Sequence, residues 1–181
     1  LFLLIIRLAL AGVFILAGVA KLTDLSGAEK AAGEFGLPER FARSYAIGLS
    51  VGEILIAALL LFTSASFYGA VLAAWLLLIF IAGMTYQVVN GRSPDCHCFG
   101  QLYSKPVSKF SIFRNVVLLV FPILLVASGR KNQGIEVWEI RGEMLPVIFG
   151  IIFLLLMVVA LIYLKRIAEQ QTVILRRIEL L

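Results

Sequence analysis

The residues best suited to chemistry gather in one short segment, residues 90–100, with the sequence NGRSPDCHCFG. It contains both cysteines of the chain, Cys96 and Cys98, two positions apart, and the single histidine, His97, lies between them. Proline and glycine flank the three residues, which is typical of a tight loop. Two thiols this close together can cycle with a disulfide or bind a soft metal ion, so this loop is the first candidate site.

Three interpretations of the cysteine pair are open. In the first, Cys96 and Cys98 cycle between dithiol and disulfide, and His97 and Arg92 are the neighbouring cations that favour a thiolate. The small ring closed by such a bridge would make it an oxidant rather than a structural crosslink. In the second, the thiolates, the imidazole and Asp95 bind zinc or copper, but the chain has no second Cys or His pair to complete the ligand set, so we expect no metal. In the third, the thiols are inert residues of a tight loop.

The composition limits where this loop can lie. Of the 181 residues, 61% are hydrophobic and 15% are charged, and the mean hydropathy is +1.02. Soluble domains are about half apolar and about a quarter charged, so a soluble enzyme, a secreted scaffold and a disordered regulator are excluded, and the lipid bilayer is the expected solvent. The net charge of +5 does not indicate nucleic-acid binding, because the basic residues flank apolar segments instead of forming a patch.

Five apolar segments are long enough to cross a bilayer as helices, at about residues 1–22, 45–62, 67–89, 110–127 and 145–164. Each must be helical, because an isolated strand would leave its backbone amides unpaired in lipid. Pro122 is expected to kink the fourth segment. Small residues that allow close helix packing stand at Gly12, Gly18, Gly48 and Gly52. The sequence therefore predicts an all-α, polytopic membrane bundle of four to five transmembrane helices.

The connections predict further elements. Residues 23–44 should include a short helix at the membrane interface, capped by Ser26 and ended by Gly36 and Pro38. Residues 165–181 have apolar residues at helical spacing, which predicts an amphipathic C-terminal helix. We expect residues 1–164 to form the bundle and residues 165–181 to form a stem that leads to a soluble domain or lies on the membrane surface.

Ionisable residues inside the apolar segments are costly and are therefore functional candidates. At 1.5 Å per residue, Glu53 should lie roughly 12 Å below the cysteine loop, and Arg7 roughly 21 Å below Lys21. Lys21 and Arg114 are therefore better placed than Arg7 to pair with Glu53. One hypothesis is that Glu53 passes protons to or from the cysteine loop, and the alternative is a buried packing carboxyl held by lysine or by backbone.

Residues 94–100 (PDCHCFG), followed by residues 106–108 (PVS) and 114–115 (RN), resemble the signature of the MauE family, the methylamine-utilisation membrane proteins grouped with DoxX-like redox-associated membrane proteins. Glu53 and the first helix fit the same pattern, and the resemblance covers about residues 1–128. It implies a multi-pass protein of the bacterial inner membrane that takes part in forming or reducing disulfides of exported proteins, beside or fused to a thioredoxin-like domain. It also implies that Cys96 and Cys98 are the redox pair, with Glu53 and Arg114 as polar partners beneath them. Family members commonly carry glycine at the position of His97.

Two rules make opposite predictions about which side of the membrane the cysteine loop faces. Most of the lysines and arginines fall on the face that bears the cysteines, and the positive-inside rule assigns such a face to the cytoplasm. Disulfide chemistry and the family resemblance favour the oxidising exterior, and we expect the exterior. Labelling intact cells with a membrane-impermeant thiol reagent distinguishes the two.

The function expected from these residues is thiol-disulfide exchange between the Cys-x-Cys loop and a thioredoxin-like partner. The catalytic residues would be Cys96, Cys98, His97, Glu53 and Arg114. A quinone is one electron carrier that disulfide-generating membrane enzymes use, but no motif identifies a quinone site. The alternative is a noncatalytic accessory or scaffold subunit of a larger membrane complex. A thiol content that responds to a redox buffer favours the first, and full complex activity after replacement of both cysteines favours the second.

Overall fold

The computed structural model describes residues 2–91, 95–96, 105–106 and 109–134, and it describes side chains for residues 2–91 and 109–134. These residues all belong to one compact unit, Leu1–Val137. In chain order the elements are α1 (Phe2–Thr23), α2 (Leu25–Glu34), α3 (Glu39–Leu61), α4 (Thr63–Val89), β1 (Asp95–Cys96), β2 (Lys105–Pro106) and α5 (Lys109–Ala127). The predicted fifth span, residues 145–164, and the predicted stem, residues 165–181, lie outside the described residues.

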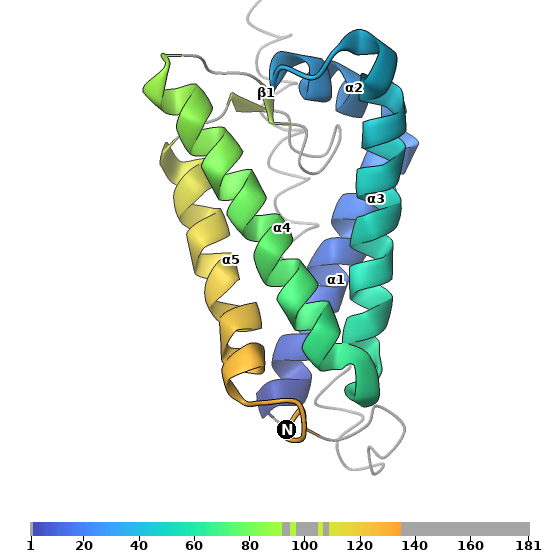
Figure 1. The fold of residues 1–181 in the computed structure, drawn as a ribbon, viewed down its shortest axis with the longest axis vertical. Coiled ribbons are helices and arrows are strands. Elements are labelled where there is room, and N and C mark those ends of the chain that lie inside the picture. Colours follow the sequence, from blue (N-terminus) through green and yellow to red (C-terminus); the bar gives the residue numbers. More distant parts are fainter. Residues whose placement is uncertain (1, 92–94, 97–104, 107–108, 135–181) are drawn as a thin grey trace, which may run out of the picture. The chain divides into compact units, whose positions relative to one another are not determined.

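Four long helices form an up-and-down bundle (Figure 1). Helix α1 packs on α3, α3 on α4, α4 on α5, and α5 returns to α1, so the four helices close a ring. Each is long and apolar enough to cross a membrane. Helix α2 and the β1–β2 pair lie at one end of the bundle, named here the cysteine end (Figure 1). The predicted all-α membrane bundle is confirmed over the described residues.

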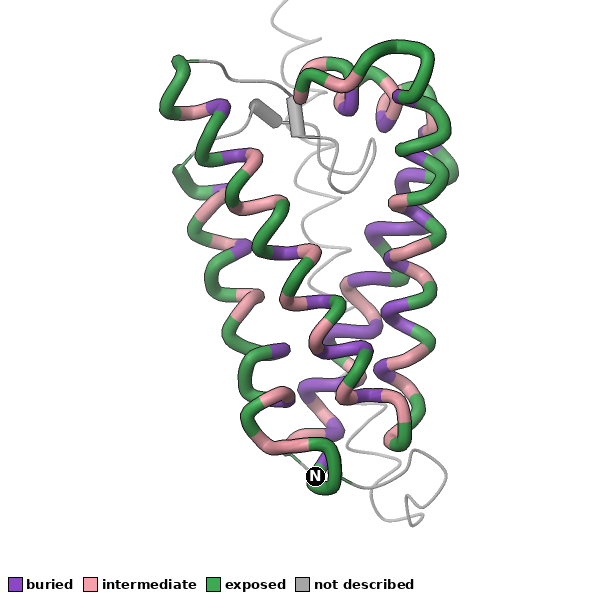
Figure 2. Tube along the Cα trace, in the orientation of Figure 1, coloured by how far each residue is buried: buried purple, intermediate pink, exposed green. Residues whose placement is uncertain are grey.

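The outer surface of the bundle is apolar. Leu55, Trp75 and Phe113 are 58%, 63% and 63% exposed on three different helices. Buried positions alternate with these exposed ones along each helix and face the interior (Figure 2). Exposed apolar residues on every long helix are incompatible with water and are what a bilayer requires.

Helix α2 is the predicted short helix, but its cap differs from the prediction. Asp24, not Ser26, is the N-cap residue, and its carboxylate accepts a hydrogen bond from the backbone N–H of Gly27 at 3.2 Å. At the other end Gly36 has a φ of 98°, a left-handed conformation that glycine adopts without a steric cost. The predicted end of this helix at Gly36 is therefore confirmed.

The turn between α3 and α4 is tighter than expected. Residues 63–66, predicted to be a polar connection, form the first turn of α4, and Phe62 alone separates the two helices. The hydroxyl of Ser66 donates to the carbonyl of Thr63 at 2.9 Å, so these polar residues bond to the main chain within the helix. Helix α3 also begins at Glu39, six residues before the predicted span, because its polar first turns extend beyond the apolar part.

Close packing of α1 on α3 depends on one glycine. A Cβ atom at Gly18 would lie 2.8 Å from the backbone oxygen of Ser50, whereas nothing lies within 4 Å of one at Gly12, Gly48 or Gly52. Of the glycines predicted to mediate packing, only Gly18 does so among the described residues. Helix α5 continues through Pro122 to Ala127, so this proline does not break the span.

Candidate functional site

The cysteine loop is closed by a short strand pair. Strands β1 and β2 are antiparallel, with Asp95 opposite Pro106 and Cys96 opposite Lys105. This pairing brings together the two strands on either side of residues 97–104, and β1 contacts α2. Cys96 is therefore fixed, at the level of its backbone, beside α2 and across from a lysine. His97 and Cys98 lie outside the described residues, as does the side chain of Cys96.

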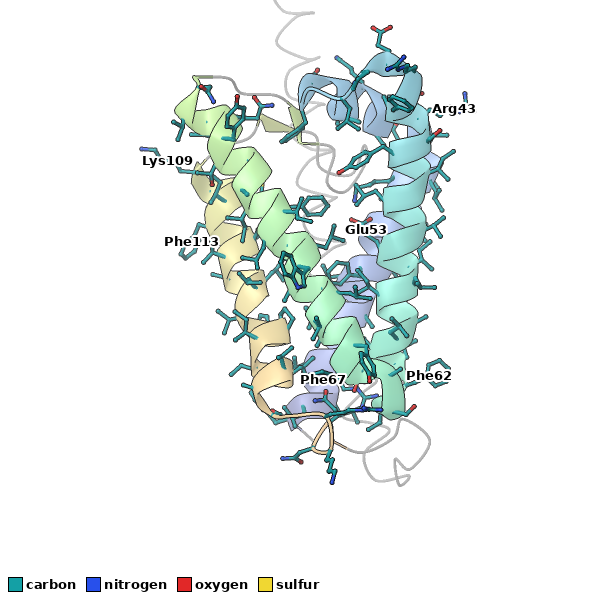
Figure 3. The ribbon with its side chains drawn as sticks, viewed as in Figure 1. Arg43, Glu53, Phe62, Phe67, Lys109 and Phe113 are labelled. Carbon is teal, nitrogen blue, oxygen red and sulfur yellow. The ribbon has the colours of Figure 1, made fainter. Side chains whose placement is uncertain are left out.

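Beneath the cysteine end, a buried ion pair joins α1 to α3. The ammonium group of Lys21 donates to both carboxylate oxygens of Glu53, at 2.7 and 2.8 Å. The two residues are 5% and 1% exposed. The ammonium also donates to the carbonyl of Ala17 at 3.5 Å, a longer contact than either bond to Glu53. Figure 3 shows Glu53 pointing from α3 into the bundle. The predicted pairing of Glu53 with Lys21 is confirmed.

Glu53 and Arg114 share a small cavity. Both residues line a space of about 30 Å³ between the long helices, together with Asn115 of α5. Such a volume exceeds the roughly 10–15 Å³ that one water molecule needs, and the lining supplies polar partners for it. The structure therefore brings two of the predicted site residues together around a space that can hold water.

A larger cavity lies directly on the other side of the ion pair. It has a volume of about 190 Å³ and is bounded by α1, α2, α3 and α4. Lys21 lines this cavity, and Glu53 lines the smaller one, so the ion pair stands between the two spaces. The wall is otherwise mostly apolar: Ala28, Ala31, Ala32, Phe35, Leu37, Tyr45, Ala46, Leu49, Ile79, Phe80, Gly83 and Met84.

Sequence reasoning missed this cavity, although one signal pointed to it. Ala28, Ala31 and Ala32 have the spacing of one face of a helix, and all three line the cavity. Small side chains on the inner face of an interfacial helix leave space beneath it. The sequence does not say that α2 folds back against α3, so the space could not be located.

Arg7 has a structural role at the opposite end of the bundle. Its guanidinium donates to the carbonyls of Leu60 and Leu61 at 2.9 and 2.8 Å, to the hydroxyl of Thr63 at 2.7 Å and to the carbonyl of Gln133 at 3.1 Å. The carbonyls of Leu60 and Leu61 end α3, where helix carbonyls lack partners within the helix. A cation there also interacts favourably with the helix dipole. Arg7 therefore fixes the turn between α3 and α4 and lies far from the cysteine end.

Comparison with known proteins agrees with the resemblance seen in the cysteine segment. The family described as methylamine utilisation protein MauE matches residues 1–128. A methylamine utilization protein MauE from Paracoccus denitrificans is 35% identical over 126 residues, which cover 68% of this chain and 67% of that protein. No solved structure matches the chain. The match extends over the whole bundle from α1 to α5 and includes the cysteine segment, and the chain belongs to the MauE family.

Proposed function

We propose that this chain is a membrane thiol-disulfide redox protein that serves methylamine utilisation, the process for which its relative in Paracoccus denitrificans is named. Cys96 and Cys98 form the redox pair and exchange electrons with a thioredoxin-like partner. When the pair is oxidised, the two S–H bonds are lost, an S–S bond forms, and two electrons and two protons leave. When electrons flow from this chain to the partner, these two electrons and two protons reduce a disulfide of the partner to two thiols.

The observation that carries this proposal is the Cys96-His97-Cys98 sequence that continues from β1, a strand that pairs with β2 and contacts α2. Because β1 contacts α2, the backbone of Cys96 gives a partner a defined docking point. Lys105 is the backbone partner of Cys96 in the ladder, a basic residue that sequence reasoning did not assign to the site. Cations near a thiol favour the thiolate, which is the nucleophile in disulfide exchange. His97 is the second candidate for this role.

Glu53 is proposed to pass protons, and Arg114 is its charged neighbour across the smaller cavity. Thiol oxidation releases two protons, and Glu53, buried beneath the cysteine end, is a carboxylate that can accept one. The Lys21–Glu53 pair lies between the two cavities, and the smaller one can hold water between Glu53 and Arg114. A variant with Lys21→Met and Glu53→Leu removes both titratable groups without leaving one charge buried. If that variant folds and keeps its turnover, the relay is rejected.

The proposal is tested by measuring how the cysteine pair responds to redox potential. The purified protein is equilibrated in glutathione buffers of graded ratio, and its thiols are then tagged with a maleimide that changes mobility. We expect both tags to be lost together with one two-electron midpoint. Cys96→Ser and Cys98→Ser should each abolish the transition, and His97→Gly should shift it without abolishing it. Thiols that tag equally in every buffer would overturn the proposal.

A noncatalytic role as an accessory subunit is the competing function, and the same variants separate the two. If the chain only holds partners together, a Cys96→Ser, Cys98→Ser variant should copurify with them and support full methylamine-dependent growth. If it exchanges electrons, the variant should copurify but fail to support growth. A mixed disulfide with a thioredoxin-like protein, trapped through Cys96→Ser or Cys98→Ser, identifies the partner.

We further propose that the cysteine end faces the exterior of a bacterial inner membrane. An oxidising compartment supports a disulfide cycle, although this end also carries Lys30, Arg40, Arg43 and Lys109, which the positive-inside rule assigns to the cytoplasm. A membrane-impermeant thiol reagent applied to intact cells should label Cys96 and Cys98. Labelling only after the cells are permeabilised would reverse the orientation.

A further inference from the structure

The cavity of about 190 Å³ at the cysteine end has the size and the lining of a ligand site. Apolar cavities of about 150 Å³ bind benzene, so this one has room for a single six-membered ring with small substituents. Two of the residues that line it, Tyr45 and Ile79, are 40% and 55% exposed on the outer surface of the bundle. In a bilayer that surface faces lipid, so a ligand can enter from the membrane and leave a tail outside.

The lining also provides hydrogen-bond donors at two places. Tyr45 contributes a phenol, and Lys21 contributes an ammonium group. The 3.5 Å contact of Lys21 with the carbonyl of Ala17 is one that an oxygen acceptor on a ligand can replace while both bonds to Glu53 remain. The cavity therefore fits a flat apolar ring that carries carbonyl oxygens.

We infer that this cavity binds the ring of a lipid-soluble quinone, which accepts the electrons of the Cys96–Cys98 pair. The inference rests on the proposed thiol-disulfide function and names its membrane-side electron acceptor. Oxidation of the dithiol to the disulfide releases two electrons and two protons, and a quinone takes up two electrons and two protons to become the quinol. The stoichiometry closes without a further reactant.

The arrangement of the elements supports this occupant over an acyl chain. An acyl chain in the cavity would offer no acceptor to the phenol of Tyr45, whereas a quinone carbonyl accepts a hydrogen bond from it and can also accept one from Lys21. Helix α2 forms one wall of the cavity and also contacts β1, which carries Cys96. The electron donor and the proposed acceptor site therefore share one helix.

Binding is tested first, in a protein that lacks both thiols. The full chain with Cys96→Ser and Cys98→Ser is purified in detergent and titrated with a benzoquinone that carries a short alkyl tail. A Cβ atom at Gly83 would lie 3.8 Å from the ring of Phe35, so a methyl group fits there, but the rest of a leucine side chain must occupy the cavity. Gly83→Leu should weaken quinone binding about tenfold or more, because it fills the space of the ring.

The matched control is Ala82→Leu, one residue away on an exposed face of α4. It adds the same kind of side chain toward lipid and should change the affinity by less than about twofold. Equal binding to Gly83→Leu and to the control would overturn the inference. Equal competition by an alkyl alcohol of the same tail length would also overturn it, because the cavity would then be an acyl-chain site.

Electron transfer is tested next, with both cysteines present and reduced. Anaerobic addition of the quinone should convert the thiol pair to a disulfide, detected by loss of maleimide tagging, and Gly83→Leu should prevent this. A small soluble oxidant should still oxidise the pair in Gly83→Leu. If the soluble oxidant forms the disulfide and the quinone does not, the quinone inference fails and the thiol function stands. If neither oxidant forms the disulfide, the proposed thiol function itself fails.

Discussion

Removing one partner of the Lys21–Glu53 pair should destabilise the bundle far more than removing both. The pair is bidentate, at 2.7 and 2.8 Å, and the two residues are 5% and 1% exposed. Two unit charges about 4 Å apart attract by about 4 kcal/mol at an effective dielectric constant near 20, and burying each ion costs several kcal/mol. The attraction and the two charge-assisted hydrogen bonds offset much of this cost while both charges are present. When one partner is removed, the remaining ion still pays the free energy of burial but no longer gains the attraction of the opposite charge.

From these opposing contributions we expect Lys21→Met or Glu53→Leu alone to lower the free energy of unfolding by about 3–5 kcal/mol. The double variant should lie within about 1 kcal/mol of the parent protein, because methionine and leucine fill similar volumes without charge. Unfolding is measured by titrating mixed micelles with a denaturing detergent and following tryptophan fluorescence. The thermodynamic cycle of the four proteins isolates the coupling between the two residues.

The surface pair Lys30–Glu34 is the matched control. Its atoms are 3.8 Å apart, and its side chains are 68% and 32% exposed, so Lys30→Met should cost less than about 0.5 kcal/mol. If the double variant is as unstable as the two single variants combined, the residues act independently and the reasoning about mutual compensation is wrong. If the single variants cost no more than Lys30→Met, the pair is solvated and does not lie in a low-dielectric interior.

Three further predictions concern packing, the far end of the bundle and the thiols. Gly18→Ala should lower the free energy of unfolding by about 1–3 kcal/mol, because its Cβ would lie 2.8 Å from a backbone oxygen of α3, whereas Gly12→Ala, with nothing within 4 Å, should be neutral or stabilising in the same detergent titration. Arg7→Lys should lower the free energy of unfolding by about 2–4 kcal/mol, because one ammonium group cannot make both guanidinium hydrogen bonds to the two carbonyls at the end of α3. A loss of stability smaller than that of Lys30→Met would show that these two hydrogen bonds are unimportant. Lys105→Gln should slow alkylation of Cys96 at neutral pH about threefold or more, measured in a Cys98→Ser background, and an unchanged rate would remove Lys105 from the proposed site.

The sequence alone determined the class of this protein and singled out the segment that is proposed to carry its chemistry. Four apolar segments became four helices because lipid offers no partner for a backbone amide, so composition and length fix both the solvent and the secondary structure. The boundaries were less certain where polar residues continue a helix beyond the apolar part, as they do at the start of α3 and of α4. The spacing of Cys96 and Cys98 was likewise visible without a structure.

The tertiary structure decided which polar residue meets which. Helical periodicity says which face of a helix a residue occupies, but not which neighbouring helix that face meets or at what height. For this reason the sequence left Lys21 and Arg114 as equal partners for Glu53, and only the packing of α1 on α3 selected Lys21. The same packing places the guanidinium of Arg7 at the C-terminal end of α3. The cavity beneath α2 depends on a helix that folds back against α3, which is a long-range arrangement that no local pattern encodes.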